Sequence, residues 1–241
     1  MKKILLIIIL ILAIFQMVAI SANLFSDGFE GGNLNAWDAN ANDSGDLSVS
    51  TAAKLHGVYG LSCLIDDNTA IYVTDETPNV ETRYRWRFYI NPNSLSMAPS
   101  TVNFMICQTV SSTWATPVCL YFGYTGSDYW IKVADIQDGV WISTSNHIIT
   151  NGVHCIEVDW KRATDAATHD GFLSLWIDGV LKETLANLNN DTEDVTRIDF
   201  GACNMWGTLS GTLFLDDFQS NNDGSVIGML GDNAIMFGIN F

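Results

Sequence analysis

Two carboxylic acids and one tryptophan are the residues of this chain whose types and spacing could do chemistry. Glu157 and Asp159 alternate in residues 154–161 (HCIEVDWK), and Trp176 lies in a second alternating run. If the polar residues between the two runs close a simple hairpin, Trp176 lies opposite Glu157 and Asp159 lies opposite Ser174. Sugars stack their C–H faces on aromatic rings and need polar partners for their hydroxyls, so this patch is a candidate carbohydrate-binding site. The alternative is that Trp176 covers the sheet against a loop, and a one-residue shift of register would separate the pairs.

Both runs are predicted β-strands. In the first run Ile156, Val158 and Trp160 alternate with polar residues, which is typical of antiparallel strands with one buried face. Short runs of the same kind recur between residues 24 and 217, separated by Gly, Asn, Asp or Pro, with almost no helical periodicity. The pattern therefore predicts an all-β sandwich or barrel.

The segment RYRWRFYINP predicts a central strand with two different faces. Its aromatic residues share one face and its arginines share the other, namely Tyr84, Trp86 and Phe88 against Arg83, Arg85 and Arg87. We expect the aromatic face in the core and a basic face outside it.

Residues 1–22 have the layout of a secretory signal peptide, with two lysines, an apolar run and small residues at Ser21 and Ala22. We expect cleavage near Ala22 and secretion to the extracellular space or cell surface; the alternative is an uncleaved N-terminal anchor. The remainder predicts one sandwich domain over residues 23–219 and a C-terminal extension over residues 220–241. The extension is either a flap packed on the sandwich or a tail for partner binding or export.

Charge and hydropathy exclude some partners. The formal net charge of −16 disfavours nucleic acids and anionic membrane surfaces, and it favours cations and neutral ligands. No segment after the leader is long and apolar enough to span a bilayer. The five cysteines show no CxxC spacing, which argues against a zinc site. Cys107 and Cys119 flank a predicted hairpin and could form a disulfide, but buried free thiols are an equal alternative.

Several motifs resemble those of a known superfamily. The opening FSDGFEGGNLNAW, the middle RYRWRFYINPNSLSM, the hairpin that ends in WIDG and the closing TLFLDDFQS resemble laminin-G-like jelly rolls of the concanavalin A-like lectin and glucanase superfamily. The resemblance implies an antiparallel two-sheet β-sandwich. It says less about function, because this architecture hosts lectins, glycosidases, lyases and adhesive modules.

The opening and closing motifs also resemble the first and last strands of calcium-bearing carbohydrate-binding modules. That resemblance implies a structural Ca²⁺ near Glu30 and Asp217, with Asp27 and Asp216 close by and backbone oxygens from the segment around His56. Ca²⁺ takes about six to eight oxygen ligands, which carboxylates and carbonyls supply. The alternative is that these acids are solvated or cap local turns.

The same superfamily bears on catalysis. Its laminarinase-like glycosidases carry Glu-x-Asp-x-Glu on one strand, so that alternate acids project into one groove. Glu157 and Asp159 begin this pattern, but Lys161 stands where the second Glu should be, which argues against hydrolysis. A lyase could use a histidine with an Arg or Tyr, the candidates being His147, His154 and His169.

We therefore predict a secreted, non-catalytic, carbohydrate-binding sandwich that Ca²⁺ stabilises. The first alternative is a cell-surface or matrix structural protein that binds protein partners, and the second is a polysaccharide hydrolase or lyase. Besides Trp176, the candidate aromatic platforms for a glycan are Trp114, Tyr124, Tyr129 and Trp130. Trp37, Trp86 and Trp160 are expected in the core.

Overall fold

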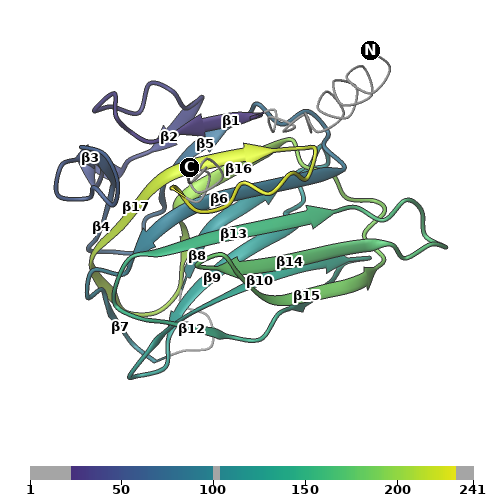
Figure 1. The fold of residues 1–241 in the computed structure, drawn as a ribbon. Helices are drawn as coiled ribbons and strands as arrows, with labels where there is room; N and C mark the ends of the chain where they lie inside the picture. Colours follow the sequence, from purple (N-terminus) through teal and green to yellow (C-terminus); the bar gives the residue numbers. More distant parts are fainter. Residues whose placement is uncertain (1–22, 100–103, 232–241) are drawn as a thin grey trace, which may run out of the picture.

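The computed structural model describes residues 23–99 and 104–231, which form two antiparallel sheets packed face to face (Figure 1). The two-sheet, all-β sandwich expected from the sequence is thereby confirmed. The leader over residues 1–22 and the end of the C-terminal extension lie outside the described residues. No helix in the described ranges has the length and apolar character needed to cross a membrane.

Sheet A is the first layer. Across the sheet its main strands follow the order β15 (Val180–Leu188), β14 (Gly171–Ile177), β13 (His154–Lys161), β6 (Arg83–Asn91), β17 (Leu209–Asn221), β4 (Gly60–Ile65) and β3 (Leu47–Ser50). Two short strands, β1 (Phe25–Asp27) and β7 (Ser96–Met97), also pair with β17. Because β1 and β17 are neighbours, the start and the end of the described chain meet in this sheet (Figure 1).

Sheet B is the second layer. Its main strands follow the order β11 (Val140–Ser143), β10 (Tyr129–Gln137), β9 (Val118–Tyr124), β8 (Phe104–Val110), β16 (Arg197–Met205), β5 (Ile71–Asp75) and β2 (Ala39–Ala41). A short strand, β12 (His147–Ile149), pairs with β10, and a single 3-10 turn spans Asp43–Gly45 in the described part of the chain. Most connections are short, as expected of antiparallel strands joined by turns.

The core lies between the sheets and contains the predicted inward faces. On β6 the aromatic residues Tyr84, Trp86 and Phe88 are buried in the core, while the arginines of the same strand project from the outer face of sheet A. Trp37 and Trp160 are also in the core. These placements follow from the two-residue repeat of a strand, which sends alternate side chains to opposite faces.

The hairpin of β13 and β14 has the predicted register. Glu157 pairs with Trp176, and Asp159 pairs with Ser174. The following turn to β15 consists of Asp178 and Gly179, which both have positive φ, at 53° and 72°. Two central residues with positive φ are the signature of a type I′ hairpin turn, which Asp-Gly favours.

The hairpin of β8 and β9 contains a β-bulge that decides the state of two cysteines. Met105 pairs with Tyr121, but Cys107 pairs with Leu120 rather than Cys119, because the register shifts by one residue between Met105 and Cys107. Cys119 pairs with Gln108 instead, so the two thiols point to opposite faces of sheet B. All five cysteines are free and buried, and the suggested Cys107–Cys119 disulfide is wrong.

The C-terminal extension begins later than expected. Strand β17 continues through Asn221, two residues beyond the boundary placed at 219, and Ser220 and Asn221 pair with Trp86 and Arg85. Residues 222–231, which we name the C-terminal strap, then turn back over the outer face of sheet A (Figure 1). The strap covers the arginine face of β6 and the adjoining part of β13.

Candidate functional site

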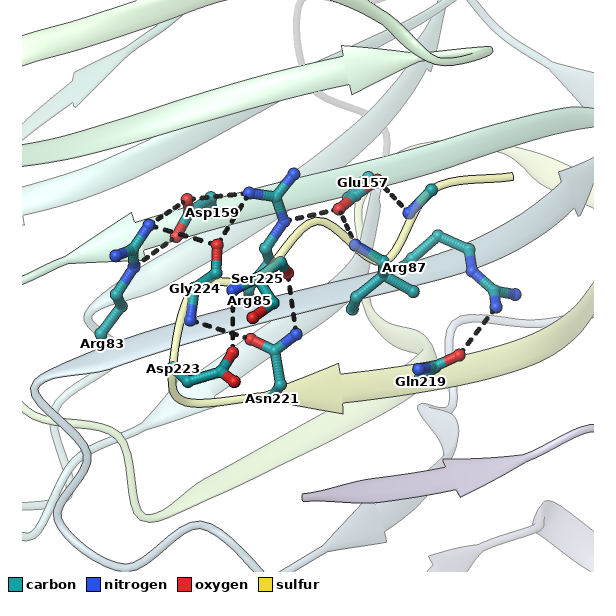
Figure 2. A network of polar contacts seen from close by, with 12 residues as sticks. Arg83, Arg85, Arg87, Glu157, Asp159, Gln219, Asn221, Asp223, Gly224 and Ser225 are labelled. Carbon is teal, nitrogen blue, oxygen red and sulfur yellow. Dashed lines mark hydrogen bonds and ion pairs between the residues drawn. The ribbon is translucent and has the colours of Figure 1, made fainter. Parts of the chain in front are cut away.

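The predicted sugar patch on sheet A is covered. Glu157 and Asp159 project away from the core, but they are only 4% and 3% exposed. Arg85 Nε donates to Glu157 Oε1 at 2.5 Å, and Arg83 Nη2 and Arg85 Nη1 donate to Asp159 Oδ2 at 2.8 and 3.1 Å (Figure 2). The Trp176 ring lies 4.6 Å from the guanidinium carbon of Arg85.

The strap accounts for this burial. The backbone amides of Ile227 and Gly228 donate to the two carboxylate oxygens of Glu157 at 2.9 and 3.0 Å. The predicted pairing of these residues with Trp176 is therefore present, whereas the carboxylates are occupied by arginines and by the strap. In this arrangement Glu157 and Asp159 cannot contact a sugar. Sequence patterns could not show this, because the strap lies some seventy positions further along the chain.

Two of the predicted aromatic platforms are also buried. The Trp130 ring is 1% exposed, and a Cβ on Gly123 of the neighbouring strand would lie 2.0 Å from its Cζ2 atom. Tyr129 faces the core, stacks on Phe122 and donates its hydroxyl to Leu95 O at 2.7 Å. Trp130 therefore presents no ring face to a ligand. Tyr129 contributes only one wall of a shallow hollow of about 450 Å³, which it shares with Tyr124 and several polar residues.

Trp114, another of the candidate platforms, is open to solvent. It is 79% exposed at the tip of the β8–β9 hairpin. Beside it lies a hollow of about 290 Å³ lined by Glu76, Val110, Ser111, Ser112, Trp114, Thr196 and Arg197, which we name the Trp114 hollow. The guanidinium carbon of Arg197 lies 5.7 Å from the centroid of the indole ring. An exposed ring beside hydroxyls and charges is the arrangement expected of a sugar subsite.

The outer face of sheet B continues the Trp114 hollow with a polar network. Asp199 on β16 is fully buried, and its carboxylate accepts hydrogen bonds from Thr74 Oγ1, Gln108 Nε2 and Arg197 Nη2 at 2.9, 2.9 and 3.2 Å. Pairing between β5, β16 and β8 places Thr74, Asp199 and Gln108 in one row. The network holds Arg197 at the mouth of the hollow.

A second aromatic group lies on the same face. Lys132 Nζ is 5.3 Å from the ring centroid of Tyr121 on the adjacent strand, and Trp206 packs 6.5 Å from Tyr121 with 41% of its surface exposed. Burial lowers the pKa of Lys132 and raises the pKa of Tyr121. We name the Trp114 hollow, the Asp199 network and this aromatic group together the sheet B face.

Sequence reasoning missed most of the sheet B face. Tyr121 and Lys132 are the polar members of alternating runs, so their outward orientation was readable. The contact between Tyr121 and Lys132 could not be predicted from the sequence, because it depends on the pairing of β9 with β10. Asp199, Gln108 and Thr74 come from three strands that lie far apart in the sequence.

The residues predicted to hold a metal gather at one corner of sheet A. Strand β1 pairs with β17, and Glu30 reaches the segment before β4, where its carboxylate accepts from the amides of Val58 and Tyr59 at 2.8 to 3.1 Å. Asp216 accepts from the amides of Leu55 and His56 at 2.8 and 3.0 Å. The residues of this acidic corner are Asp27, Glu30, His56, Asp216 and Asp217.

Three members of the acidic corner come especially close. One ligand atom from each of His56, Asp216 and Asp217 lies within 4.8 Å of the other two, and His56 Nδ1 is 3.1 Å from Asp217 Oδ2. Burial raises the pKa of Asp216 to about 6, against the hydrogen bonds from His56 and Leu55 that lower it. Burial also raises the pKa of Asp217, opposed by Arg87 and His56.

The acidic corner suits a hard cation. Asp217 Oδ2 is buried and has no hydrogen-bond donor among the described residues beyond its 3.1 Å contact with His56 Nδ1, so it keeps a lone pair for a ligand. Asp27, by contrast, already accepts from Phe29 N and Trp37 Nε1 at 2.8 Å each. Glu30 Oε1 and Asp216 Oδ2 each accept two backbone amides, whereas Glu30 Oε2 and Asp216 Oδ1 accept one each and keep a further lone pair. Carboxylate oxygens are the ligands that Ca²⁺ prefers.

The three histidines considered for a lyase lie in separate surroundings. His147 Nε2 is 3.1 Å from Glu183 Oε2, and His154 Nδ1 is 2.7 Å from Asp178 Oδ2. His169 is exposed in the loop between β13 and β14. Lys161, which interrupts the glucanase-like pattern, donates to Asp170 Oδ2 at 2.7 Å. These histidines are thus not brought together into one catalytic group.

Comparison with known proteins supports the fold. No protein-family model and no curated protein sequence matches the chain. Among solved structures, the cellulose induced protein Cip1 has a TM-score of 0.59 at 16% identity and covers 85% of this chain and 99% of its own. The alginate lyase Aly36B, in complex with an alginate trisaccharide, has a TM-score of 0.52 at 14% identity and covers 76% of this chain and 87% of its own.

A third similar structure is domain 4 of AbnA, an extracellular arabinanase from Geobacillus stearothermophilus, in complex with arabinotriose. Its TM-score is 0.51 at 12% identity, with 84% of this chain and 93% of that chain covered. At such identities the likeness establishes the fold alone, a two-sheet jelly-roll β-sandwich. The narrower resemblance to laminin-G-like domains stays a prediction.

Proposed function

We propose that this protein is a secreted, non-catalytic carbohydrate-binding β-sandwich and that the sheet B face holds the glycan. The observation that carries the proposal is the exposed Trp114 ring beside a hollow lined by Arg197, Glu76 and three hydroxyl residues. At about 290 Å³ the hollow is near the lower limit of small-molecule pockets, which is roughly 300 Å³, and so suits one or two sugar units.

The chemistry of the sheet B face supports this function. Trp114 and Trp206 offer ring faces for C–H stacking, and the hydroxyls of Ser112 and Thr196 lie beside the first of them. The Asp199 network fixes Arg197 before any ligand arrives, which lowers the entropy that binding must overcome. Two structural neighbours are complexes with oligosaccharides, which is in keeping with this proposal.

We further propose that the acidic corner binds a structural Ca²⁺ ion through Glu30, Asp216 and Asp217. The ion would join β1, the segment before β4 and β17, and would neutralise carboxylates that otherwise repel one another. It would act on stability rather than on the glycan directly.

A glycan array followed by calorimetry tests the function. The array should include neutral and uronate-containing polysaccharides, because Arg197 and Lys132 place two cations on this face of an acidic protein. We expect Trp206→Ala to weaken binding at least tenfold for oligosaccharides long enough to reach from the Trp114 hollow to Trp206, at the other end of β16. Trp176→Ala, on sheet A, should leave binding unchanged. Trp141→Ala should also leave it unchanged; this variant removes a tryptophan from edge strand β11 whose exposure (44%) is similar to that of Trp206 (41%).

Other outcomes would redirect the proposal. Absence of binding to every glycan, with capture of defined protein partners, would replace it by the structural or adhesive alternative. Release of reducing ends or of unsaturated sugars in a parallel product assay would show a hydrolase or a lyase. Loss of binding in Trp176→Ala alone would move the site to sheet A.

A further inference from the structure

The C-terminal strap is held through its main chain. The Gly224 carbonyl accepts from Arg85 Nη1 at 3.3 Å and from Arg83 Nη2 at 3.5 Å (Figure 2). Further along, the Leu230 amide donates to the Tyr89 hydroxyl at 2.6 Å. Together with the two amides bound by Glu157, these hydrogen bonds hold backbone atoms near both ends and in the middle of the strap.

The surface beneath the strap is built for polar recognition. Each of its three arginines lies over an aromatic ring: Arg83 over Phe172 at 5.5 Å, Arg85 over Trp176 at 4.6 Å, and Arg87 over Tyr89 at 5.3 Å. Stacking on a ring fixes a guanidinium and leaves its edge free for acceptors. The carboxylates of Glu157 and Asp159 hold Arg83 and Arg85 from the side.

This surface has more donors than the strap uses. Arg85 Nη2 and Arg87 Nε are buried, yet neither has a hydrogen-bond acceptor among the described residues. Buried charged donors are normally satisfied, because a donor left without a partner loses its hydration and gains no hydrogen bond in return. If this surface served only to pack the strap against the sheet, apolar side chains would do so at a lower desolvation cost. Its charged groups instead contact the backbone carbonyl and amides of the strap.

We propose that the outer face of sheet A carries a binding groove for a peptide main chain and that the strap is its resident ligand. The groove consists of Arg83, Arg85, Tyr89, Glu157 and Asp159. The arginines bind a carbonyl, Glu157 binds two successive amides, and Tyr89 binds an amide two residues further on. The site is separate from the sheet B face and does not depend on glycan binding there.

The structure also defines what the groove selects. Gly224 has φ +75°, and a Cβ there would lie 1.8 Å from Arg83 Cζ, so the residue over the arginines must be glycine. Arg83 cannot swing aside freely, because Asp159 holds it through two hydrogen bonds. Three residues later the side chain of Ile227 is buried. The expected ligand is therefore a peptide that has a glycine with positive φ and, three residues later, an apolar residue.

A matched pair of glycine variants of the full chain tests the proposal. Gly224→Ala collides with Arg83, whereas Gly228→Ala, at nearly the same φ (+73°), meets only Val226 Cγ1 at 4.0 Å. Both carry the same backbone strain, so their difference isolates the groove contact. Ile227→Asp is a second way to lift the strap, because it would place a charge beside Glu157.

The readouts are amide hydrogen exchange at residues 227, 228 and 230 and binding of a labelled synthetic peptide with the sequence of residues 222–231. Wild type should protect these amides and bind the peptide weakly, because a tethered strap competes at a millimolar effective concentration. In Gly224→Ala and Ile227→Asp, exchange should accelerate at least tenfold and the peptide should bind. Gly228→Ala should behave more like wild type, and the same peptide with alanine at its first glycine should bind at least tenfold more weakly.

Three outcomes would overturn the proposal. The first is a lifted strap with no peptide binding, which would make the strap a structural cover only. The second is equal release in Gly224→Ala and Gly228→Ala, which would assign the effect to backbone strain. The third is gain of glycan binding, rather than peptide binding, in the released variants, which would identify the groove as a covered sugar site.

Discussion

Trp114 adopts a backbone conformation that its side chain does not favour. Its φ of 63° lies in the left-handed region, which is uncommon for a bulky residue and costs about 1–2 kcal/mol. The loop holds it there through a hydrogen bond from its amide to Ser111 O at 2.9 Å. A large ring kept in an unfavourable conformation and left exposed is more easily explained by binding than by packing.

Replacement of Trp114 by glycine should separate binding from stability. Glycine adopts a positive φ without strain, so the free energy of unfolding should change by no more than about 1 kcal/mol in either direction. Glycan affinity should fall at least tenfold, because stacking on the ring is lost. Calorimetry and urea unfolding measure the two effects, and Trp114→Phe should restore most of the affinity. Equal glycan affinity in wild type and Trp114→Gly would remove the hollow from the proposed site.

Asp135 is a second residue with a measurable consequence. It is fully buried between the sheets and accepts from Trp160 Nε1 at 3.2 Å and from Asn190 Nδ2 at 2.7 Å. Burial raises its pKa from 3.8 to about 7. The folded state therefore keeps a proton that the unfolded chain releases above about pH 4.

This carboxyl should make the protein less stable as pH rises from about 4 to 7, since the unfolded state binds fewer protons there. Each unit of pKa difference corresponds to roughly 1.4 kcal/mol. Asp135→Asn should flatten the dependence of the urea midpoint on pH and raise stability at pH 8. Asp66→Asn, an exposed control, should leave the curve unchanged. A curve of Asp135→Asn that matches wild type would contradict the raised pKa.

At the scale of elements, the acidic corner exists because β1 and β17 pair. The β-bulge between Asp216 and Gln219 lets Asp217 turn out of the ladder with φ 48°, toward Gly28 and His56. No single strand carries the site. Its occupation should therefore affect how firmly the first and last strands are joined.

Calcium should raise the thermal unfolding midpoint of the folded chain. At one hundred times its dissociation constant the ion would add about 2.7 kcal/mol, or roughly 5–10 °C for a domain of this size. Asp217→Asn should abolish most of this shift, because it removes the charge of a carboxylate whose buried Oδ2 contacts only His56 among the described residues. Mg²⁺ at equal concentration is the control, since it requires stricter geometry. Equal midpoints with calcium and with chelator would remove the metal from this protein.

For the whole molecule, the five thiols report on the integrity of the sandwich. Burial raises the pKa of Cys63, Cys119 and Cys155 to about 12, and it raises those of Cys107 and Cys203 well above the usual range. Thiolate is the reactive form, so native thiols should react slowly with a disulfide reagent. Labelling should follow unfolding, and five thiols should react in denaturant without reductant. Only three reactive thiols under those conditions would reveal a disulfide.

Local patterns predicted more of the fold than of the sites. The alternation around Glu157 and Trp176 was sufficient to pair β13 with β14, because a hairpin depends only on neighbouring residues. The prediction that Trp130 is a platform for a glycan is wrong, although the alternation of its strand is clear in the sequence. It projects from the outer face as alternation requires, but Gly123 on the next strand leaves room for the ring to be buried.

The sequence alone predicted the all-β class, the inward face of β6 and the β13–β14 register. It also predicted the set of acids on and beside the first and last strands. Only the tertiary structure showed that the strap covers Glu157, that a bulge separates Cys107 from Cys119, and that Trp114 meets Arg197. Side-chain alternation is a property of each strand by itself. Which face stays open depends on strand order and on contacts between segments far apart in the chain, and no local periodicity encodes those.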